Sequence, residues 1–317
     1  MRRRARSSTA SRSRRARAAD ARVIAIFGPT AAGKTAVAQA VAARVGAEVV
    51  SADSAAVYRG LPIITAAPEA PTRLVGVFPL THDVSVGEYQ RLAHEAIDEI
   101  VAAGRIAVVA GGTGLYFRAA ISGLALPPAP APGVRPLLEL LYDRVGAEEA
   151  HRLLAGRDPA AAARVHPNDR RRVVRALELT EVGSSLAPAV DRLWTEETRL
   201  PTTIVALVAP AEELDARIRA RTAQMLARGA VAEARAAWAG PLSATAQKVL
   251  GLEEFATLPP DEAFEEVVAA TRRLARYQRK WLRKLRGVVT LDGTRRPEEL
   301  ADEIVALAGA GERLPRR

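Results

Sequence analysis

The chain alternates short apolar runs with longer segments in which apolar residues recur at helical spacing. Apolar runs at 22–27, 48–51 and 106–110 predict buried strands, because each is short and ends at a turn signal. Segments 34–45 and 86–103 have the period of a helix. Strands that alternate with helices predict an α/β core, in which a parallel sheet carries helices on both faces.

The pattern changes in the middle of the chain. A proline-rich connection, LALPPAPAPG, is followed by consecutive helices at 135–183 with no clear strand, and TIVALV at 203–208 restores a strand. Further along, we expect helices at 211–228, 229–239 and 261–285, a strand at 288–291 and a helix at 297–308. The predicted domains are a catalytic core at 22–123 and 201–309, an inserted all-helical domain at 124–200, and tails at 1–21 and 310–317.

Positive charge is concentrated at the start of the chain. The net charge is +10, and residues 1–20 contribute eight arginines against one aspartate. This segment lacks the apolar centre of a secretory signal. Two interpretations stay open. One is a disordered extension or a start codon called too early, and the other is an arm that binds RNA phosphates without sequence preference.

Composition excludes several classes of protein. The chain has no cysteine, so disulfides and thiolate metal sites are excluded. No apolar run approaches the 18 residues that a membrane-spanning helix needs. We therefore expect a cytoplasmic protein with no membrane partner, and we expect a monomer.

The stretch GPTAAGKT matches the phosphate-loop pattern G-x-x-x-x-G-K-[ST]. It lies between a predicted strand and a predicted helix, as in P-loop NTPase-like folds, so backbone N–H groups would surround an anion. Lys34 would contact phosphate oxygens, and Thr35 would bind Mg²⁺. The motif also occurs in ATP-binding and other nucleotide-binding proteins, so it names no reaction by itself. The loop comprises Gly28, Pro29, Thr30, Ala31, Ala32, Gly33, Lys34 and Thr35.

Two more polar residues follow strand ends. Asp53 comes 19 residues after Lys34, and Thr113 follows the strand at 106–110. The carboxyl ends of parallel strands share one edge of the sheet, where ligands bind. Asp53 could therefore bind a substrate hydroxyl or accept a proton. It could also cap a helix or assist Mg²⁺ without contacting it.

Six segments occur in the order, and near the spacing, found in bacterial tRNA dimethylallyltransferases of the IPP transferase family. They are GPTAAGKT, SADSAAVYRGL, AGGTGLYFRA, HPNDRRRVVRALEL, RTAQMLARG and TRRLARYQRKWLRK. The resemblance implies transfer of a dimethylallyl group from dimethylallyl diphosphate to N6 of adenine 37 in tRNA. Pyrophosphate would be the leaving group, and the phosphate loop would hold it together with Mg²⁺.

The resemblance also implies roles for individual residues. Asp53 would be the base, Thr113 would hydrogen-bond near the reacting groups, and Arg221 would contact the pyrophosphate. Contacts to the tRNA anticodon stem-loop would come from Asp53, Ser54, Ala55, Ala56, Arg135, Arg171, Arg172, Arg175, Lys248, Arg272 and Arg276. From charge alone, the basic helices could equally be solvated faces.

The chain departs from the family pattern around residues 56–77. Ile64 and Ala67 replace a usual glycine and lysine, and Thr72 replaces a usual histidine. The hypothesis is that prenyl transfer is retained while RNA recognition is altered. Alternatives are an adenylate prenyltransferase, which has less need of an RNA-binding insert, and a small-molecule kinase, which would phosphorylate its substrate. A non-catalytic RNA-binding module is the fourth reading, and the presence of Asp53 counts against it.

Overall fold

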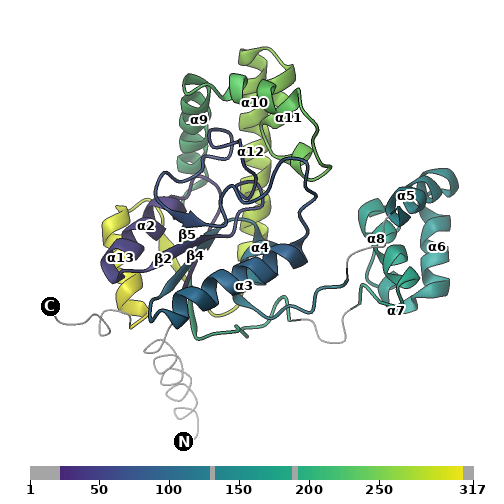
Figure 1. Cartoon of the computed structure of the whole chain (residues 1–317), viewed down its shortest axis with the longest axis horizontal. Coiled ribbons are helices and arrows are strands. Elements are labelled where there is room, and N and C mark those ends of the chain that lie inside the picture. Colours follow the sequence, from purple (N-terminus) through teal and green to yellow (C-terminus); the bar gives the residue numbers. More distant parts are fainter. Residues whose placement is uncertain (1–21, 129–132, 188–191, 310–317) are drawn as a thin grey trace, which may run out of the picture. The chain divides into compact units, whose positions relative to one another are not determined.

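The structure is a computed structural model that describes residues 22–128, 133–187 and 192–309. The chain divides into two compact units, and each is described by itself (Figure 1). The first unit comprises Met1–Gly123 with Trp194–Arg317, and the second is Leu124–Leu193. The expectations for the segments 1–21 and 310–317 lie outside the described residues. No helix in the described part of the chain is both long enough and apolar enough to span a membrane.

The first unit is built on a six-stranded sheet in the order β3-β2-β4-β1-β5-β6. All five neighbouring pairs are parallel, so the predicted parallel α/β sheet is confirmed. The two-residue strand β3 was not predicted, because so short a strand has no periodic signal. The strands are β1 (Val23–Phe27), β2 (Glu48–Ser51), β3 (Thr72–Arg73), β4 (Ala107–Gly111), β5 (Thr202–Val208) and β6 (Val288–Asp292).

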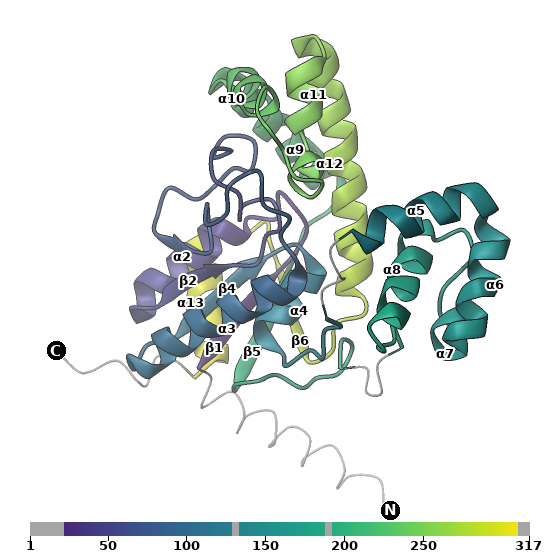
Figure 2. The same ribbon diagram turned by 45° about the vertical axis from the view of Figure 1, so that its right-hand side comes forward.

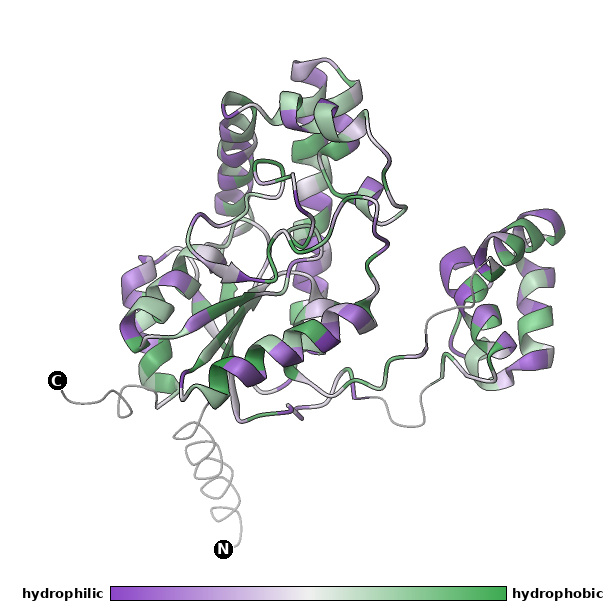
Figure 3. Ribbon diagram, viewed as in Figure 1, coloured by the Kyte–Doolittle hydropathy of each residue, from purple (hydrophilic) through white to green (hydrophobic). Residues whose placement is uncertain are grey.

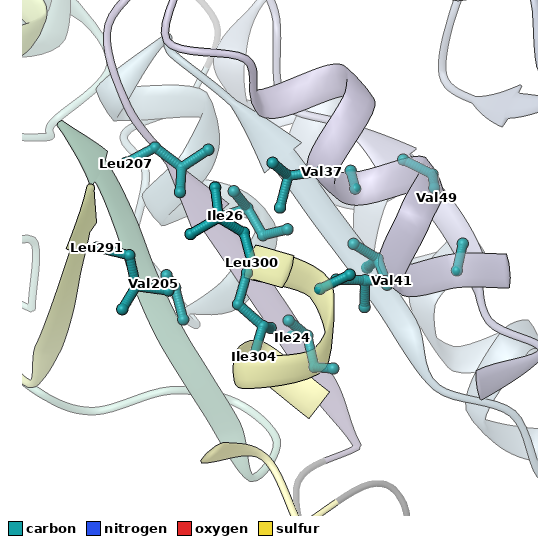
Figure 4. Packing of buried hydrophobic residues seen from close by; sticks show 14 of the residues in the cluster. Ile24, Ile26, Val37, Val41, Val49, Val205, Leu207, Leu291, Leu300 and Ile304 are labelled. Atoms are coloured by element: carbon teal, nitrogen blue, oxygen red, sulfur yellow. The ribbon is translucent and has the colours of Figure 1, made fainter. Parts of the chain in front are cut away.

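Helices cover both faces of the sheet. On one face, α2 (Lys34–Val45) and α13 (Pro297–Leu307) pack over β1, and their apolar side chains point toward those of the strands (Figure 4). On the other face are α3 (Val86–Ala102) and α4 (Gly114–Ile121). There the rings of Phe27 and Phe117 lie 5.1 Å apart. Because β1 is buried on both faces, every residue in VIAIF is apolar.

Four helices of the first unit gather beyond the loops that connect β2 to α3 (Figure 2). Proline opens α12, and acidic residues in its first turn complement the positive end of the helix dipole. Apolar side chains of α9 and α12, among them Ile218 and Val268, pack together. The helices are α9 (Ala211–Ala227), α10 (Ala230–Trp238), α11 (Leu252–Thr257) and α12 (Pro260–Leu282), and a 3₁₀ turn, η1, spans Ala246–Lys248.

Helices are the only regular secondary structure among the described residues of the second unit. Its helices are α5 (Val134–Val145), α6 (Ala147–Arg157), α7 (Pro159–Ala162) and α8 (Arg170–Glu181). The Asp169 side chain accepts a hydrogen bond from the Arg172 N–H and so begins α8. The unit has its own apolar core, which includes Leu138, Leu154 and Leu177. Hydrophobic positions follow the central strands and form bands along the helices (Figure 3).

Candidate active site

Three strand ends of the first unit converge on one pocket. Strand β4 lies between β1 and β2 in the sheet, so the segments that follow these three strands are neighbours. The pocket has a volume of about 160 Å³. Seven of the residues predicted to form the site line it: Thr30, Lys34, Thr35, Asp53, Ala55, Ala56 and Arg221.

The phosphate loop has a backbone suited to binding an anion. Gly33, at the N-terminal end of α2, has φ 85°, and Ala31 has φ 64°. A left-handed alanine costs of order 1–3 kcal/mol, and such strain is typical of ligand-binding loops. Gly33 has no side chain to cap α2. The backbone N–H groups of the first turn are therefore available to an anion.

Two cations reach the pocket without a carboxylate partner. Lys34 Nζ donates to the carbonyl of Pro29 at 2.7 Å, and Arg221 donates to Thr30 Oγ1 at 3.1 Å. Neither forms an ion pair with a described residue. The pKa of Lys34 is lowered to about 8, mainly by burial; the charge of Asp53 opposes the change, and the charge of Arg221 contributes to it to a lesser extent. Burial also lowers the pKa of Arg221, again against the effect of Asp53. The two cations need an anion, and a diphosphate would supply one.

Asp53 uses one of its carboxylate oxygens in hydrogen bonds with the described residues. Oδ1 accepts hydrogen bonds from the N–H groups of Ala55 at 2.9 Å and Ala56 at 3.4 Å. The other oxygen, Oδ2, accepts none from the described residues. Asp53 thus caps the turn that follows it, and no helix begins there, so the alternative of a helix cap is not what the structure has. Its second oxygen remains available to a substrate or a metal ion.

Thr113 lies beside the pocket lining and contacts Ser54. Its Oγ1 accepts a hydrogen bond from the Ser54 N–H at 3.2 Å, and the two hydroxyl oxygens are 3.3 Å apart. This contact joins the end of β4 to the segment after β2. In this structure, Thr113 therefore supports the turn that carries Asp53.

The residues present fit a magnesium ion shared with a substrate. Thr35 is exposed in the first turn of α2, and its hydroxyl bonds to no described residue. No three His, Cys, Asp or Glu side chains form a metal cluster in the described ranges. Mg²⁺ commonly takes one or two protein oxygens and completes its shell with phosphate oxygens and water. The Thr35 hydroxyl and the free Asp53 oxygen are suitable donors.

The residues predicted to contact tRNA fall into two groups. Arg171, Arg172, Lys248 and Arg276 are exposed and form no ion pair with any described residue. Arg135 and Arg175 both bind the buried carboxylate of Glu178, at 2.9 and 3.0 Å. Arg272 binds Asp215 at 2.7 Å. Exposed charges without partners are free for RNA phosphates, whereas the paired ones also stabilise the fold.

The remainder of the pocket wall is largely apolar. Ile64 and Thr72, two of the positions that depart from the family pattern, line it, and Ala67 does not. Thr72 Oγ1 accepts a hydrogen bond from Gln39 at 3.1 Å. Gln278 also lines the pocket and contacts the phosphate loop. Gln278 was not predicted from the sequence, because it appears within a basic run. Helical spacing from Val267, Thr271 and Leu274 would have placed it on the pocket face.

Comparison with known proteins identifies relatives along most of the chain. Residues 56–285 match the family model described as IPP transferase, and residues 21–73 match the one described as Isopentenyl transferase. A tRNA dimethylallyltransferase of Anaeromyxobacter dehalogenans (strain 2CP-C) is 43% identical in an alignment 297 residues long, which covers 89% of this chain and 99% of that protein. One from Salinispora arenicola (strain CNS-205) is 39% identical, over 85% of this chain and 82% of that protein.

Solved structures show the same fold. The tRNA isopentenylpyrophosphate transferase of Bacillus halodurans is 30% identical and superposes with a TM-score of 0.65. The match covers 92% of this chain and 97% of that one. A eukaryotic dimethylallyltransferase acting on tRNA superposes with a TM-score of 0.70 at 23% identity, over 86% of this chain and 74% of that one. The second likeness concerns the fold alone.

Proposed function

This chain belongs to the IPP transferase family, and we propose that it transfers the dimethylallyl group of dimethylallyl diphosphate to N6 of adenine 37 in tRNA. The products are N6-isopentenyladenosine and pyrophosphate. The observation that carries the proposal is the pocket itself. It combines a phosphate loop, two cations without carboxylate partners, a carboxylate with a free oxygen and an apolar wall.

The proposed chemistry follows from these groups. The N6 nitrogen attacks the allylic carbon, a C–N bond forms, and the C–O bond to the diphosphate breaks. The free oxygen of Asp53 accepts the proton that N6 loses, because the exocyclic amine is a weak nucleophile while it keeps that proton. Lys34 and Arg221 stabilise the charge that collects on the departing pyrophosphate. Bound Mg²⁺, held by the Thr35 hydroxyl, would add positive charge at the leaving group.

We assign RNA binding to exposed cations of both units, which would contact the anticodon stem-loop of the tRNA. Arg171 and Arg172 on α8, and Arg276 on α12, would contact backbone phosphates, which fix register without reading sequence. The adenine must leave the loop stack to reach Asp53, and for an unpaired base this costs about a few kcal/mol. We further propose that the protein is a cytoplasmic monomer.

The test is transfer of labelled dimethylallyl diphosphate, with Mg²⁺, to an anticodon stem-loop that carries adenines at positions 36–38. AMP, ADP and ATP are offered as competing acceptors. We expect label in the RNA at N6 and little in the mononucleotides. Equal or greater transfer to a mononucleotide would contradict the tRNA assignment. Phosphorylated product without prenylation would point to a kinase.

A further inference from the structure

Gln278 is a buried polar side chain that joins α12 to the phosphate loop. It is 5% exposed, and its Oε1 accepts a hydrogen bond from the backbone N–H of Thr30 at 2.7 Å, across 248 residues of sequence. It shares the pocket-facing side of α12 with Val267 and Leu274. A buried amide is unfavourable without hydrogen bonds, so its place among apolar residues calls for polar partners.

The bond to Thr30 fixes the orientation of the amide. Since Oε1 accepts from an N–H group, Nε2 must occupy the other position of the amide. Nε2 packs against Gly112, where an added Cβ would lie 2.4 Å from it and 3.0 Å from the carbonyl oxygen of Gly28. Only glycine permits this close approach. Nε2 therefore lies beside the start of the phosphate loop.

The amide nitrogen of Gln278 has no hydrogen-bond acceptor among the residues that the structure describes. Nε2 donates to none of the described residues, although Gln278 lines the pocket. Thr30 receives a second contact, from Arg221 of α9 through its hydroxyl. Two pocket-lining side chains from separate helices thus meet at one residue of the phosphate loop.

We propose that Gln278 binds the diphosphate of the prenyl donor and positions the loop that holds it. Oε1 fixes the loop through Thr30, while Nε2 donates to a diphosphate oxygen. The identity of this ligand rests on the proposed function. A neutral amide donor beside Lys34 and Arg221 adds a directed hydrogen bond to an anionic acceptor, and such bonds are stronger than those between neutral groups.

Two substitutions separate a substrate donor from a purely structural residue. Gln278→Glu keeps an acceptor for Thr30 but replaces the donor with a negative charge. Gln278→Met keeps the size and removes both functions. We expect Gln278→Glu to weaken binding of inorganic pyrophosphate about 10- to 100-fold, and more than Gln278→Met does. A carboxylate in the pocket repels the anion whatever the role of Gln278, so the neutral variant decides: if Gln278→Met binds pyrophosphate as tightly as the wild type, the proposal fails.

The control is Gln224→Glu, which adds the same charge at an exposed position of α9 outside the pocket lining. It should bind pyrophosphate like the wild type, and the affinity of both Gln278 variants for stem-loop RNA should change less than about 2-fold. In wild-type protein labelled at its five glutamines, pyrophosphate should shift a side-chain amide signal that Gln278→Met lacks. If pyrophosphate shifts no such signal, the proposal is overturned. This measurement uses the wild-type protein, so it stands even if a variant folds poorly. Pyrophosphate binding is measured without prenyl transfer. A wild-type protein that binds pyrophosphate but transfers no prenyl group would therefore contradict the proposed function and not the role of Gln278.

Discussion

The pocket of the first unit and the helical second unit use cationic side chains in opposite ways. In the pocket, Lys34 and Arg221 bond to oxygens of the phosphate loop and form no ion pair with a described residue. In the second unit, Arg135 and Arg175 share the carboxylate of Glu178, which is 1% exposed. The first arrangement leaves positive charge for a ligand, and the second neutralises it within the fold.

The contrast gives a physical criterion for a binding site. Holding a cation away from water is unfavourable unless an opposite charge compensates it. Because Lys34 and Arg221 form no ion pair with a described residue, binding of an anion beside them is favourable. Arg175, by contrast, has its anion built in. Substitutions of the pocket cations and of the paired arginines should therefore have unequal effects on anion binding.

Asp53→Asn should lower the rate of prenyl transfer by about 10² to 10⁴. The amide oxygen can still accept the hydrogen bonds of Ala55 and Ala56, so the turn is kept while the base is lost. Single-turnover transfer to the stem-loop measures the rate, and a filter assay measures RNA affinity. Asp53→Ala, which also removes the cap, is the comparison. An equal loss of RNA affinity in Asp53→Asn would show that Asp53 mainly positions the base.

Arg221→Met should lower transfer by about 10² to 10³, because a cation aimed at the leaving group is lost. Arg175→Met is the matched change in the second unit, where the arginine already has a carboxylate partner. We expect it to leave pyrophosphate binding within about 2-fold of the wild type. Isothermal titration calorimetry measures the pyrophosphate affinity of both variants, and only Arg221→Met should bind it more weakly than the wild type. A similar loss in both variants would contradict the contrast between the units.

Glu178→Gln should destabilise the second unit by about 1–3 kcal/mol, because a buried charge pair loses one partner. Although burial raises it, the hydrogen bonds and charges of Arg135 and Arg175 keep the pKa of Glu178 below its usual value. Its stabilisation is therefore present above its unfolded pKa and is lost as pH falls through the lower, folded value. Urea unfolding of the whole chain measures it. The control is Asp143→Asn, an exposed partner of Arg170, with an expected cost below about 1 kcal/mol.

Pyrophosphate affinity should fall as the pH rises above 8. Burial lowers the pKa of Lys34 to about 8, so the lysine is charged below this pH and increasingly neutral above it. Because the anion binds the charged form, affinity should drop by up to about tenfold for each pH unit above 8. Lys34→Arg stays charged throughout and should lack this decline. The ionisation of pyrophosphate is common to both proteins, so the ratio of their affinities isolates Lys34. A ratio that does not change from pH 7 to 9 would contradict the lowered pKa.

The features that could be predicted from the sequence are those set by neighbouring residues. VIAIF followed by GPTAAGKT specifies a strand, an anion-binding loop and a helix within about twenty residues, and the structure places them there. Asp53 could be placed at the same edge, because parallel strands align their carboxyl ends. The alternation of elements likewise predicted the sheet, apart from β3.

Features that depend on distant contacts could not be predicted. Gln278 and Thr30 are 248 residues apart, and a basic run conceals the helical face that brings them together. The sequence also could not show that Arg175 forms an ion pair whereas Arg172, on the same helix, forms none with a described residue. Glu178 is three residues from Arg175, and only the packing of α5 against α8 shows that this glutamate is buried and binds Arg135 as well. Charge patterns identify basic helices, whereas burial decides which of their charges are already neutralised.

Arg172→Ala should have the smallest effect, a modest loss of RNA affinity that shrinks as salt is added. Arg172 is exposed and has no ion-pair partner among the described residues, so a phosphate contact would release one counterion. The slope of log affinity against log salt should therefore flatten by about one unit, with transfer at saturating RNA unchanged. Arg170→Ala is the control on the same helix, because Arg170 is bound to Asp143 at 2.7 Å. If Arg170→Ala flattens the slope as much as Arg172→Ala does, an intramolecular partner does not remove an arginine from the RNA-binding surface. The contrast between paired and unpaired cations would then hold only inside the pocket.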